Sequence, residues 1–461
     1  IGFVQGKTSP CVFYHVGKDI RAVIYGDDFT LLGSETALDW FRKSIQATYA
    51  VSIKARLGPH PDDDKSVRLL NRVIEWTKDG ISYEADQRHA EIIVKQLGTS
   101  LSQAVCSPGH KINPKLFVAG DETPLNPDQA SMYRALSARA NYLSQDRSDI
   151  RFAVKELCRR MSKPRNIDWK QLLVMGRYLI GRMRVVNKFD YQKNWKFIDT
   201  WTDTDHAGCM ETRKSTSGGI IMLGNHALKH WAHTQSIISL SSGEAEYYGC
   251  VRAGSASMGY KSLLADLAVT GKKIRVKTDA SVAKSMAARR GLGGIKHIEV
   301  NQLWLQEKVN DGTIDIEKVK TDVNRSDALT KYKDKTATDN HLKWTCQDVT
   351  DGRHVLMPAT GEIEQVIIDD VNDVTEEFQL GQLGSVELEV PIVNTTRMAA
   401  PALPSPGPVP GSAHDPELQQ YFEDRRKLRS GDHQVRCLCG RGVSDNPFHT
   451  CGHDGCGTKP E

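Results

Sequence analysis

The sequence predicts a mixed α/β protein, in which strands and helices alternate along most of a 461-residue chain. Three observations support this prediction. Short apolar runs end at glycine- and asparagine-containing turns, as strands do, and longer segments repeat their apolar residues at helical spacing. In addition, four widely spaced acids in the region 201–330 each stand at the end of a predicted strand or the start of a predicted helix. An α/β domain collects its catalytic groups at such positions.

The first predicted element is a β-hairpin near the N-terminus. Apolar runs at 23–25 and 29–32 flank Gly26, Asp27 and Asp28, and a tight glycine-containing turn joins them. Two adjacent acids at the tip of a hairpin reduce stability unless a cation binds there. For these residues alone, a plain Gly-Asp turn is the simpler alternative.

Residues 36–115 are predicted to form amphipathic helices with a hairpin between them. The hairpin is expected from 68–76 and 81–83, which flank a turn at 78–80. Two groups of apolar residues keep helical spacing: Leu38, Phe41, Ile45 and Tyr49, and then Ala90, Ile93, Val94 and Leu97. We interpret these stripes as core positions rather than as cofactor contacts.

Between residues 196 and 335, strands alternate with helices, which predicts an α/β sheet. The expected elements are a hairpin of 219–223 and 227–231 around Gly224 and Asn225, a helix over 242–267, a strand over 274–279, a helix through Ala287, a strand over 314–319, and a terminal helix that begins at Asp327 with Ser326 as its cap.

The candidate catalytic residues are Asp203, Glu246, Asp279 and Asp327. They come from four separate elements, and a set of oxygen ligands of this kind suits Mg²⁺, which prefers oxygen and keeps some of its waters. Two such ions can activate a water and stabilise the leaving oxygen of a phosphodiester. The alternative, which applies to each residue taken singly, is that these are ordinary surface acids.

Neighbouring acids compete with two of these candidates. Ser241 and Glu244 fit a capping box, in which Glu244 bonds back to the helix start. Residues two apart on a helix do not share a face, so Glu244 is interpreted as a cap and Glu246 as a metal ligand. Asp203 and Asp205 do share a face on a strand. Of these two, Asp203 is the predicted ligand. Asp205 is expected to contact the ligand residues rather than the ion.

Charge is distributed unevenly along the chain, whose net charge is +4. Residues 346–411 carry 11 acidic and 2 basic side chains, and residues 412–461 are close to balance at −1, so residues 1–345 carry +14. This excess suits a polyanionic partner such as nucleic acid. Solvated Lys and Arg alone would give a milder version of the same asymmetry.

Composition argues against some classes of protein. No apolar run is long enough to span a membrane and no signal peptide is evident, so no membrane partner is expected. The ten cysteines are scattered apart from a C-terminal cluster, which is not a disulfide framework and predicts a reducing compartment. The chain begins at Ile1 rather than at Met, and we expect it to be part of a longer protein.

Segment 201–249 contains WTDTDHAG, RKSTSGG and LSSGEAEY, and segment 296–331 contains KHI and SDALTK. Both resemble the ribonuclease H domain of copia-type LTR retrotransposons. The resemblance implies that the four candidate acids bind Mg²⁺ or Mn²⁺ and that the domain cleaves the RNA of RNA–DNA hybrids. Two positions depart from the family pattern: His206 replaces an aromatic residue, and Ser326 replaces an alanine. None of the four acids is lost.

Residues 1–115 resemble the end of the same element's reverse transcriptase. The tetrapeptide YGDD at 25–28 matches the Y-x-D-D motif of the polymerase palm. This match implies that Asp27 and Asp28 face a metal site, with Asp27 the stronger ligand candidate. The family's third polymerase carboxylate lies well upstream, and the 24 residues before the motif contain nothing like it. The polymerase module is therefore expected to be incomplete. Residues 120–195 resemble the family's connection segment and contain no evident catalytic group.

The C-terminal part lies outside this resemblance. Residues 346–411 are acidic and then rich in proline and small residues, which predicts a flexible linker. A small zinc site is predicted near the end, with these candidate ligands: Cys437, Cys439, Cys451 and Cys456, with His449 or His453 as a substitute for the last. The spacing is not a standard C-x₂-C pair, and free thiols in a disordered tail are the alternative.

The sequence thus predicts a fragment of a copia-type Pol polyprotein. Its expected parts are a partial reverse transcriptase (palm end and thumb) at 1–115, a connection segment at 116–195, a ribonuclease H domain with a mixed sheet at 196–335, a largely disordered linker at 336–430, and a Cys/His-rich tail at 431–461.

The predicted activity is cleavage of RNA in an RNA–DNA hybrid with Mg²⁺ or Mn²⁺, next to a truncated RNA-directed DNA polymerase. Nucleic acid, the rest of the polyprotein and a second copy of the chain are the expected partners. The expected location is the cytoplasm, in a virus-like particle, or the nucleus. The alternative is a decayed or domesticated element that acts as a non-catalytic nucleic-acid-binding or zinc-mediated interaction protein.

Overall fold

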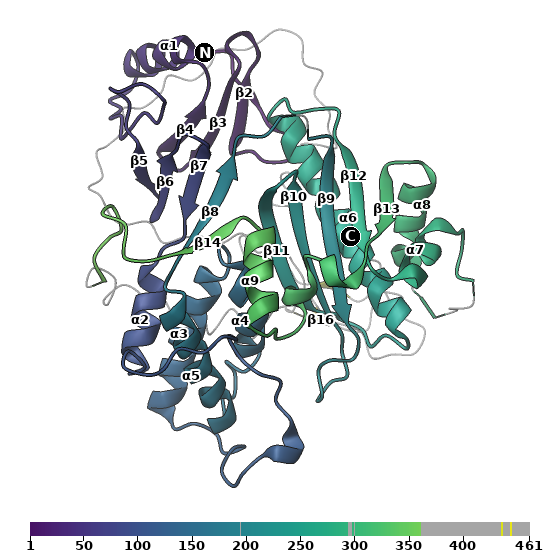
Figure 1. The fold of residues 1–461 in the computed structure, drawn as a ribbon. Helices are drawn as coiled ribbons and strands as arrows, with labels where there is room; N and C mark the ends of the chain where they lie inside the picture. Colours follow the sequence, from purple (N-terminus) through teal and green to yellow (C-terminus); the bar gives the residue numbers. More distant parts are fainter. Residues whose placement is uncertain (194, 294–296, 299, 361–434, 437–442, 445–461) are drawn as a thin grey trace. The chain divides into compact units, whose positions relative to one another are not determined.

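A computed structural model of the chain describes residues 1–360, except 194, 294–296 and 299, together with two short strands near the C-terminus (Figure 1). The chain divides into two units, Ile1–Leu383 and Gly384–Glu461. In the first unit, three sheets and a group of helices confirm the predicted mixed α/β fold. In the second, β15 (Val435–Arg436) pairs antiparallel with β16 (Val443–Ser444). The predicted linker beyond residue 360 and the four candidate zinc cysteines lie outside the described residues.

The N-terminal sheet is antiparallel, and α1 (Glu35–Gln46) packs against it through Phe41. Gly26 and Asp27 form the turn of the predicted hairpin, which is confirmed. The predicted helix is confirmed as well, although α1 ends before Tyr49. The strands of this sheet, in spatial order, are β1 (Val4–Gln5), β2 (Val12–His15), β3 (Ile20–Tyr25) and β4 (Asp28–Leu32).

A second antiparallel sheet combines segments that lie far apart in the sequence. It contains the predicted hairpin as β6 and β7, but the predicted arm 68–76 is split, because a turn at Leu70 and Asn71 joins β5 to β6. Strands from beyond residue 180 complete the sheet. Its strands, in spatial order, are β14 (Gln347–Thr350), β8 (Arg184–Asp190), β7 (Gly80–Glu84), β6 (Arg72–Trp76) and β5 (Ser66–Leu69).

Four helices share one hydrophobic core, which confirms that the apolar stripe of residues 90–97 is a core feature. Ala90, Ile93 and Val94 are buried in it, and Leu97 packs against it from just beyond the helix end. The helices are α2 (Arg88–Gln96), α3 (Pro127–Leu143), α4 (Arg151–Cys158) and α5 (Asn166–Gly181).

The third sheet is mixed, with β9 at its centre. β9 pairs antiparallel with β10 and parallel with β12, and β12 pairs parallel with β13. The hairpin and the strands predicted for residues 219–319 are confirmed. The strands, in spatial order, are β11 (His226–Thr234), β10 (Thr216–Leu223), β9 (Phe197–Asp205), β12 (Lys273–Thr278) and β13 (Ile314–Lys318).

Both faces of this mixed sheet are covered. The long predicted helix is confirmed as α6 (Ser242–Asp266), which packs across β9, β10 and β12 (Figure 1). Together with α7 (Ser281–Ala288) and α8 (Trp304–Asn310), it buries the larger core of this part of the chain. On the opposite face, Trp201 contacts a smaller core that includes Leu329. The sheet is therefore a rigid support for groups at the ends of its central strands.

The segment after β13 differs from the prediction. Asp327 begins a single 3-10 turn, η6 (Asp327–Leu329), rather than a longer helix. Ser326 does not cap it, because its hydroxyl donates instead to Oδ1 of Asn324 at 2.7 Å. The next helix is α9 (Lys335–Trp344), whose cap Asp334 accepts a hydrogen bond from the N–H of Ala337 at 2.8 Å.

Residues 335–350 thus form α9 and β14, although 336–430 was predicted to be a linker. α9 buries His341 and Leu342, and β14 extends the sheet next to β8. No helix in the described ranges is both long and apolar enough to cross a membrane. The remaining short 3-10 helices are η1 (Val16–Lys18), η2 (Pro114–Leu116), η3 (Ser148–Ile150), η4 (Val300–Leu303) and η5 (Thr321–Val323).

Candidate metal centre

Asp203 lies on the central strand of the mixed sheet. It pairs in register with Gly218 of β10 and is 4% exposed. A Cβ atom at Gly218 would lie 2.8 Å from side-chain atoms of Leu329 and Thr330. The glycine therefore allows the segment after η6 to approach the sheet beside the Asp203 carboxylate.

Glu246 comes from the start of α6. The hydroxyl of Ser241 accepts a hydrogen bond from the N–H of Glu244 at 3.2 Å, which fixes where the helix begins. α6 lies so close to β9 that a Cβ atom at Gly249 would be 2.7 Å from the hydroxyl of Thr204. This approach brings Glu246 to the strand, where its Oε1 accepts a hydrogen bond from the N–H of Thr204 at 3.1 Å.

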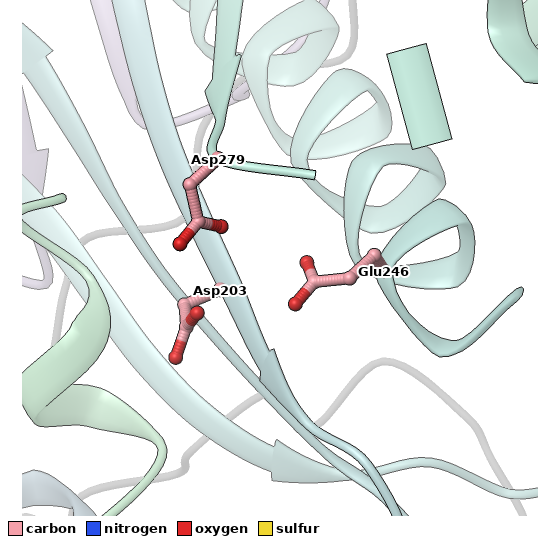
Figure 2. A group of neighbouring side chains, drawn as sticks. All are labelled: Asp203, Glu246 and Asp279. Atoms are coloured by element: carbon pink, nitrogen blue, oxygen red, sulfur yellow. The ribbon is translucent and has the colours of Figure 1, made fainter. Parts of the chain in front are cut away.

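Asp279 directly follows β12, which runs parallel to β9. Asp203, Glu246 and Asp279 converge from two strands and a helix (Figure 2). One potential ligand atom from each lies within 4.8 Å of the other two. In the part of the chain that the structure describes, this is the one group of three or more acidic, His or Cys side chains close enough to share a metal ion.

The electrostatics of this group favour a cation. Burial, together with the charges of Asp203 and Asp279, raises the pKa of Glu246 to about 9. Burial also raises the pKa of Asp203, although Lys331 and Thr330 oppose the shift. Oε2 of Glu246 is buried and has no hydrogen-bond partner. These residues fit a hard divalent ion, because it would supply both the missing positive charge and the missing partner for that oxygen.

The raised pKa of Glu246 predicts a pH-dependent stability in the absence of divalent ions. Because the folded-state pKa of about 9 exceeds the ordinary value of 4.5, the folded chain binds the proton more tightly than the unfolded chain. This contribution is complete below about pH 4.5 and is lost as the pH rises toward 9. Each pH unit inside the window is worth at most about 1.4 kcal/mol.

Denaturant unfolding of the wild type and of Glu246→Gln in a chelator, at several pH values, measures this contribution. The free energy of unfolding of the wild type should fall with pH relative to that of the variant. Parallel curves for the two proteins would mean that Glu246 does not carry the effect.

Asp327 lies beside this group rather than within it. Its carboxylate forms ion pairs with Lys331 and Lys333. The hydroxyl of Thr330 donates to Oδ2 of Asp203 and so links the same segment to the sheet. The structure thus brings three of the four candidate acids together and places the fourth among lysines. The assignment of all four as metal ligands stays a prediction.

The role of the residues after Asp327 was missed in the sequence. Thr330, Lys331 and Lys333 all contact Asp203 or Asp327. Thr330 and Lys331 belong to the SDALTK motif, and the signal for their role is that a hydroxyl and two cations follow the acid within six residues. A cationic neighbour in sequence does not reveal which carboxylate it will face after folding.

Glu244 and Glu246 point to different partners. Oε2 of Glu244 accepts a hydrogen bond from the N–H of Leu240 at 3.0 Å, one residue before the cap at which the capping box had placed it. Its Oε1 accepts from the hydroxyl of Tyr248 at 3.1 Å, and Nε2 of His297 lies 3.0 Å from its Oε2. Glu244 is buried and satisfied within the protein, as expected of a structural residue.

We therefore expect Glu244→Gln to lower the free energy of unfolding by about 1–2 kcal/mol and to keep most of the nuclease activity proposed below. Glu246→Gln should have the opposite profile: it should fold normally and lose activity. The measurement is unfolding and RNA cleavage for both variants side by side. An inactive Glu244→Gln beside an active Glu246→Gln would show that the two assignments are inverted.

The acids of the N-terminal hairpin have other surroundings. Asp27 is exposed in the turn, and Asp28 forms an ion pair with Lys54. Neither belongs to a group of three potential metal ligands in the described ranges. Their assignment to a polymerase site stays a prediction.

Comparison with known proteins shows which proteins this chain is similar to. No protein-family profile matches it. It is 23% identical over 337 residues to the retrovirus-related Pol polyprotein from transposon TNT 1-94 of Nicotiana tabacum. The matched residues are 71% of this chain and 25% of that protein. It is 25% identical over 346 residues to the corresponding polyprotein from transposon RE2 of Arabidopsis thaliana. Here the matched residues are 74% of this chain and 23% of that protein.

Two further matches cover less of the chain. An uncharacterized mitochondrial protein of Arabidopsis thaliana is 29% identical over 227 residues, which are 49% of this chain and 88% of that protein. Among solved structures, the ribonuclease H1 LC11 isolated from compost matches 32% of this chain and 99% of its own, with a TM-score of 0.22 and 17% identity. The chain spans about a quarter of the length of the Pol polyproteins that it matches.

Proposed function

We propose that this chain, whose curated homologues are retrovirus-related Pol polyproteins of plant copia-type transposons, is a Pol fragment with a metal-dependent ribonuclease H in residues 196–335. The observation that carries the proposal is the convergence of Asp203, Glu246 and Asp279, with ligand atoms within 4.8 Å of one another, near the C-terminal ends of the adjacent strands β9 and β12. These three residues would hold the divalent ion.

The arrangement suits phosphodiester hydrolysis. Divalent ions bound there would activate a water and stabilise the leaving oxygen. The protein's own contribution is to fix the carboxylates on a sheet and a helix that are packed against each other, and to keep Asp203 buried. Rigid support of this kind keeps the ligands in place as charge develops on the substrate.

The proposed substrate is an RNA–DNA hybrid, and the RNA strand is the one that is cut. The 2′-hydroxyl is the group by which a protein can distinguish RNA from DNA at a given position. The +14 charge of residues 1–345 supports binding to a polyanion. The proposed location is the cytoplasm, within a virus-like particle, or the nucleus, or both.

The test uses the full chain with Mg²⁺ or Mn²⁺ and four end-labelled substrates: the hybrid labelled on its RNA strand, the hybrid labelled on its DNA strand, duplex DNA and duplex RNA. Cleavage of the RNA strand of the hybrid alone is the expected result. A chain that folds, binds the hybrid and cuts none of the four would support the alternative, a non-catalytic nucleic-acid-binding protein.

The polymerase part is proposed to be inactive in this chain. Asp27 and Asp28 lack a third potential ligand among the described residues, and Asp28 is already paired with Lys54. We therefore expect no primer extension above background on a primed RNA template with all four deoxynucleotides. A complete reverse transcriptase assayed in parallel is the control. Template-dependent incorporation by this chain would contradict the proposal.

A zinc site formed by Cys437, Cys439, Cys451 and Cys456 remains a separate proposal. This zinc site is supported only by the presence of four cysteines close together in the sequence, because thiolate ligands suit zinc.

A further inference from the structure

Of the four candidate acids, Asp203 and Asp327 are the two that have a lysine within ion-pair distance among the described residues. Lys331 pairs with Asp327, and its Nζ lies 3.8 Å from Oδ2 of Asp203. In the described part of the chain, neither Glu246 nor Asp279 has an ion pair, and the buried Oε2 of Glu246 has no hydrogen-bond partner. The Asp203–Asp327 side is therefore neutralised by the protein itself, and the Glu246–Asp279 side is not.

The Lys331 side chain is more exposed than the two carboxylates that it contacts. It is 44% exposed, while the side chains of Asp203 and Asp327 are 6% and 19% exposed. Lys333 also pairs with Asp327, so this carboxylate keeps a partner if Lys331 swings away. A long flexible stem allows an ammonium group to leave such a contact without a change in the backbone.

We propose that Lys331 is an internal counter-cation that takes the place of a second divalent ion between Asp203 and Asp327. The free protein then binds a single divalent ion, at Asp203, Glu246 and Asp279. A second ion binds only when Lys331 moves out. This inference rests on the proposed function, because it assumes that the cluster is a metal centre.

The physical reason is competition between like charges. An ammonium group and a divalent ion cannot both lie against the same carboxylate oxygens without strong repulsion at separations of a few ångströms. A purely structural lysine would act differently, because its loss would loosen η6 without changing how many ions the site binds. Ion stoichiometry therefore separates the two roles.

The experiment is a calorimetric titration of Mn²⁺ into the metal-free full chain without nucleic acid. The proteins are the wild type, Lys331→Met and Lys320→Met. Methionine keeps the length of the lysine stem and removes its charge. Lys320 is exposed and shows no ion pair in the described ranges, so it is the matched control. Asp279→Asn identifies the shared site, because the first ion should bind much more weakly to this variant.

We expect about one ion in the wild type and in Lys320→Met. Lys331→Met should bind a second ion, with at least about tenfold higher affinity than any second event in the wild type. Two ions of similar affinity in the wild type would overturn the inference and leave the proposed function standing. The inference is also overturned, and the proposed function left standing, if Lys331→Met binds one ion like the wild type, even when its unfolding temperature is lower. If the wild type binds no ion and does not cut RNA, both proposals fail.

Discussion

The Asp279→Asn variant is expected to lose RNA cleavage by a factor on the order of a thousand while its fold is preserved. Asparagine keeps the shape of aspartate and removes its charge, so the site loses one of the three carboxylates that would hold the ion. Folding should not suffer, because removal of one of several repelling charges relieves the metal-free cluster. The measurement is the initial rate on a labelled hybrid, together with thermal unfolding and hybrid binding.

Asp322→Asn is the matched control, because Asp322 is an exposed acid in η5 that is not part of the cluster. It should cleave RNA at the wild-type rate. Near-normal cleavage by Asp279→Asn would remove this residue from the site. Loss of hybrid binding in step with the loss of activity would point to a damaged fold or surface rather than to a missing ligand.

The largest effect on stability is expected from Arg147→Ala, at about 3–5 kcal/mol. The Arg147 side chain is 1% exposed and forms two hydrogen bonds with Asp149, of 2.9 and 2.7 Å. It also donates to the carbonyl of Arg182 at 2.9 Å, and the hydroxyl of Tyr178 donates to Asp149 at 2.8 Å. The substitution would leave Asp149 buried and charged without its cation. Denaturant unfolding measures the loss.

Arg56→Ala is the control for this prediction. Arg56 pairs with Asp39 at 2.7 Å, but both side chains are more than a third exposed. Exposed pairs contribute about 0–1 kcal/mol, so this variant should unfold almost like the wild type. Equal losses for Arg56→Ala and Arg147→Ala would contradict the role assigned to burial.

The sequence was sufficient to predict the elements that carry the metal centre. The N-cap Ser241, the alternation before Asp279 and the hairpin around Gly224 are all local signals, and local signals are encoded within a few residues. The spacing rule also separated Glu244 from Glu246, which contact different partners, because residues two apart on a helix do not share a face.

The surroundings of Asp327 could not be predicted in the same way. Its position depends on how closely residues 329–330 approach Gly218, a contact between segments more than 100 residues apart. The expected terminal helix is only the turn η6, because Ser326 bonds to Asn324 instead of capping a helix. Which lysines face Asp203 and Asp327 therefore depends on this long-range contact and not on the SDALTK motif alone.

Other long-range contacts explain the differences outside the site. The ring of His341 in α9 lies 2.9 Å from the hydroxyl of Ser148. Residues that looked like a linker are therefore ordered by contacts with partners almost 200 residues earlier in the chain.

The most direct test of the central claim is the position of Mn²⁺, located by anomalous X-ray scattering in crystals of the full chain. We expect a peak bonded to Asp203, Glu246 and Asp279, at about 2.1–2.2 Å from carboxylate oxygens. The Asp279→Asn variant should lose this peak under the same conditions. Mn²⁺ bound elsewhere, with these three carboxylates free of metal in a protein that still cuts RNA, would show that they are not the metal centre.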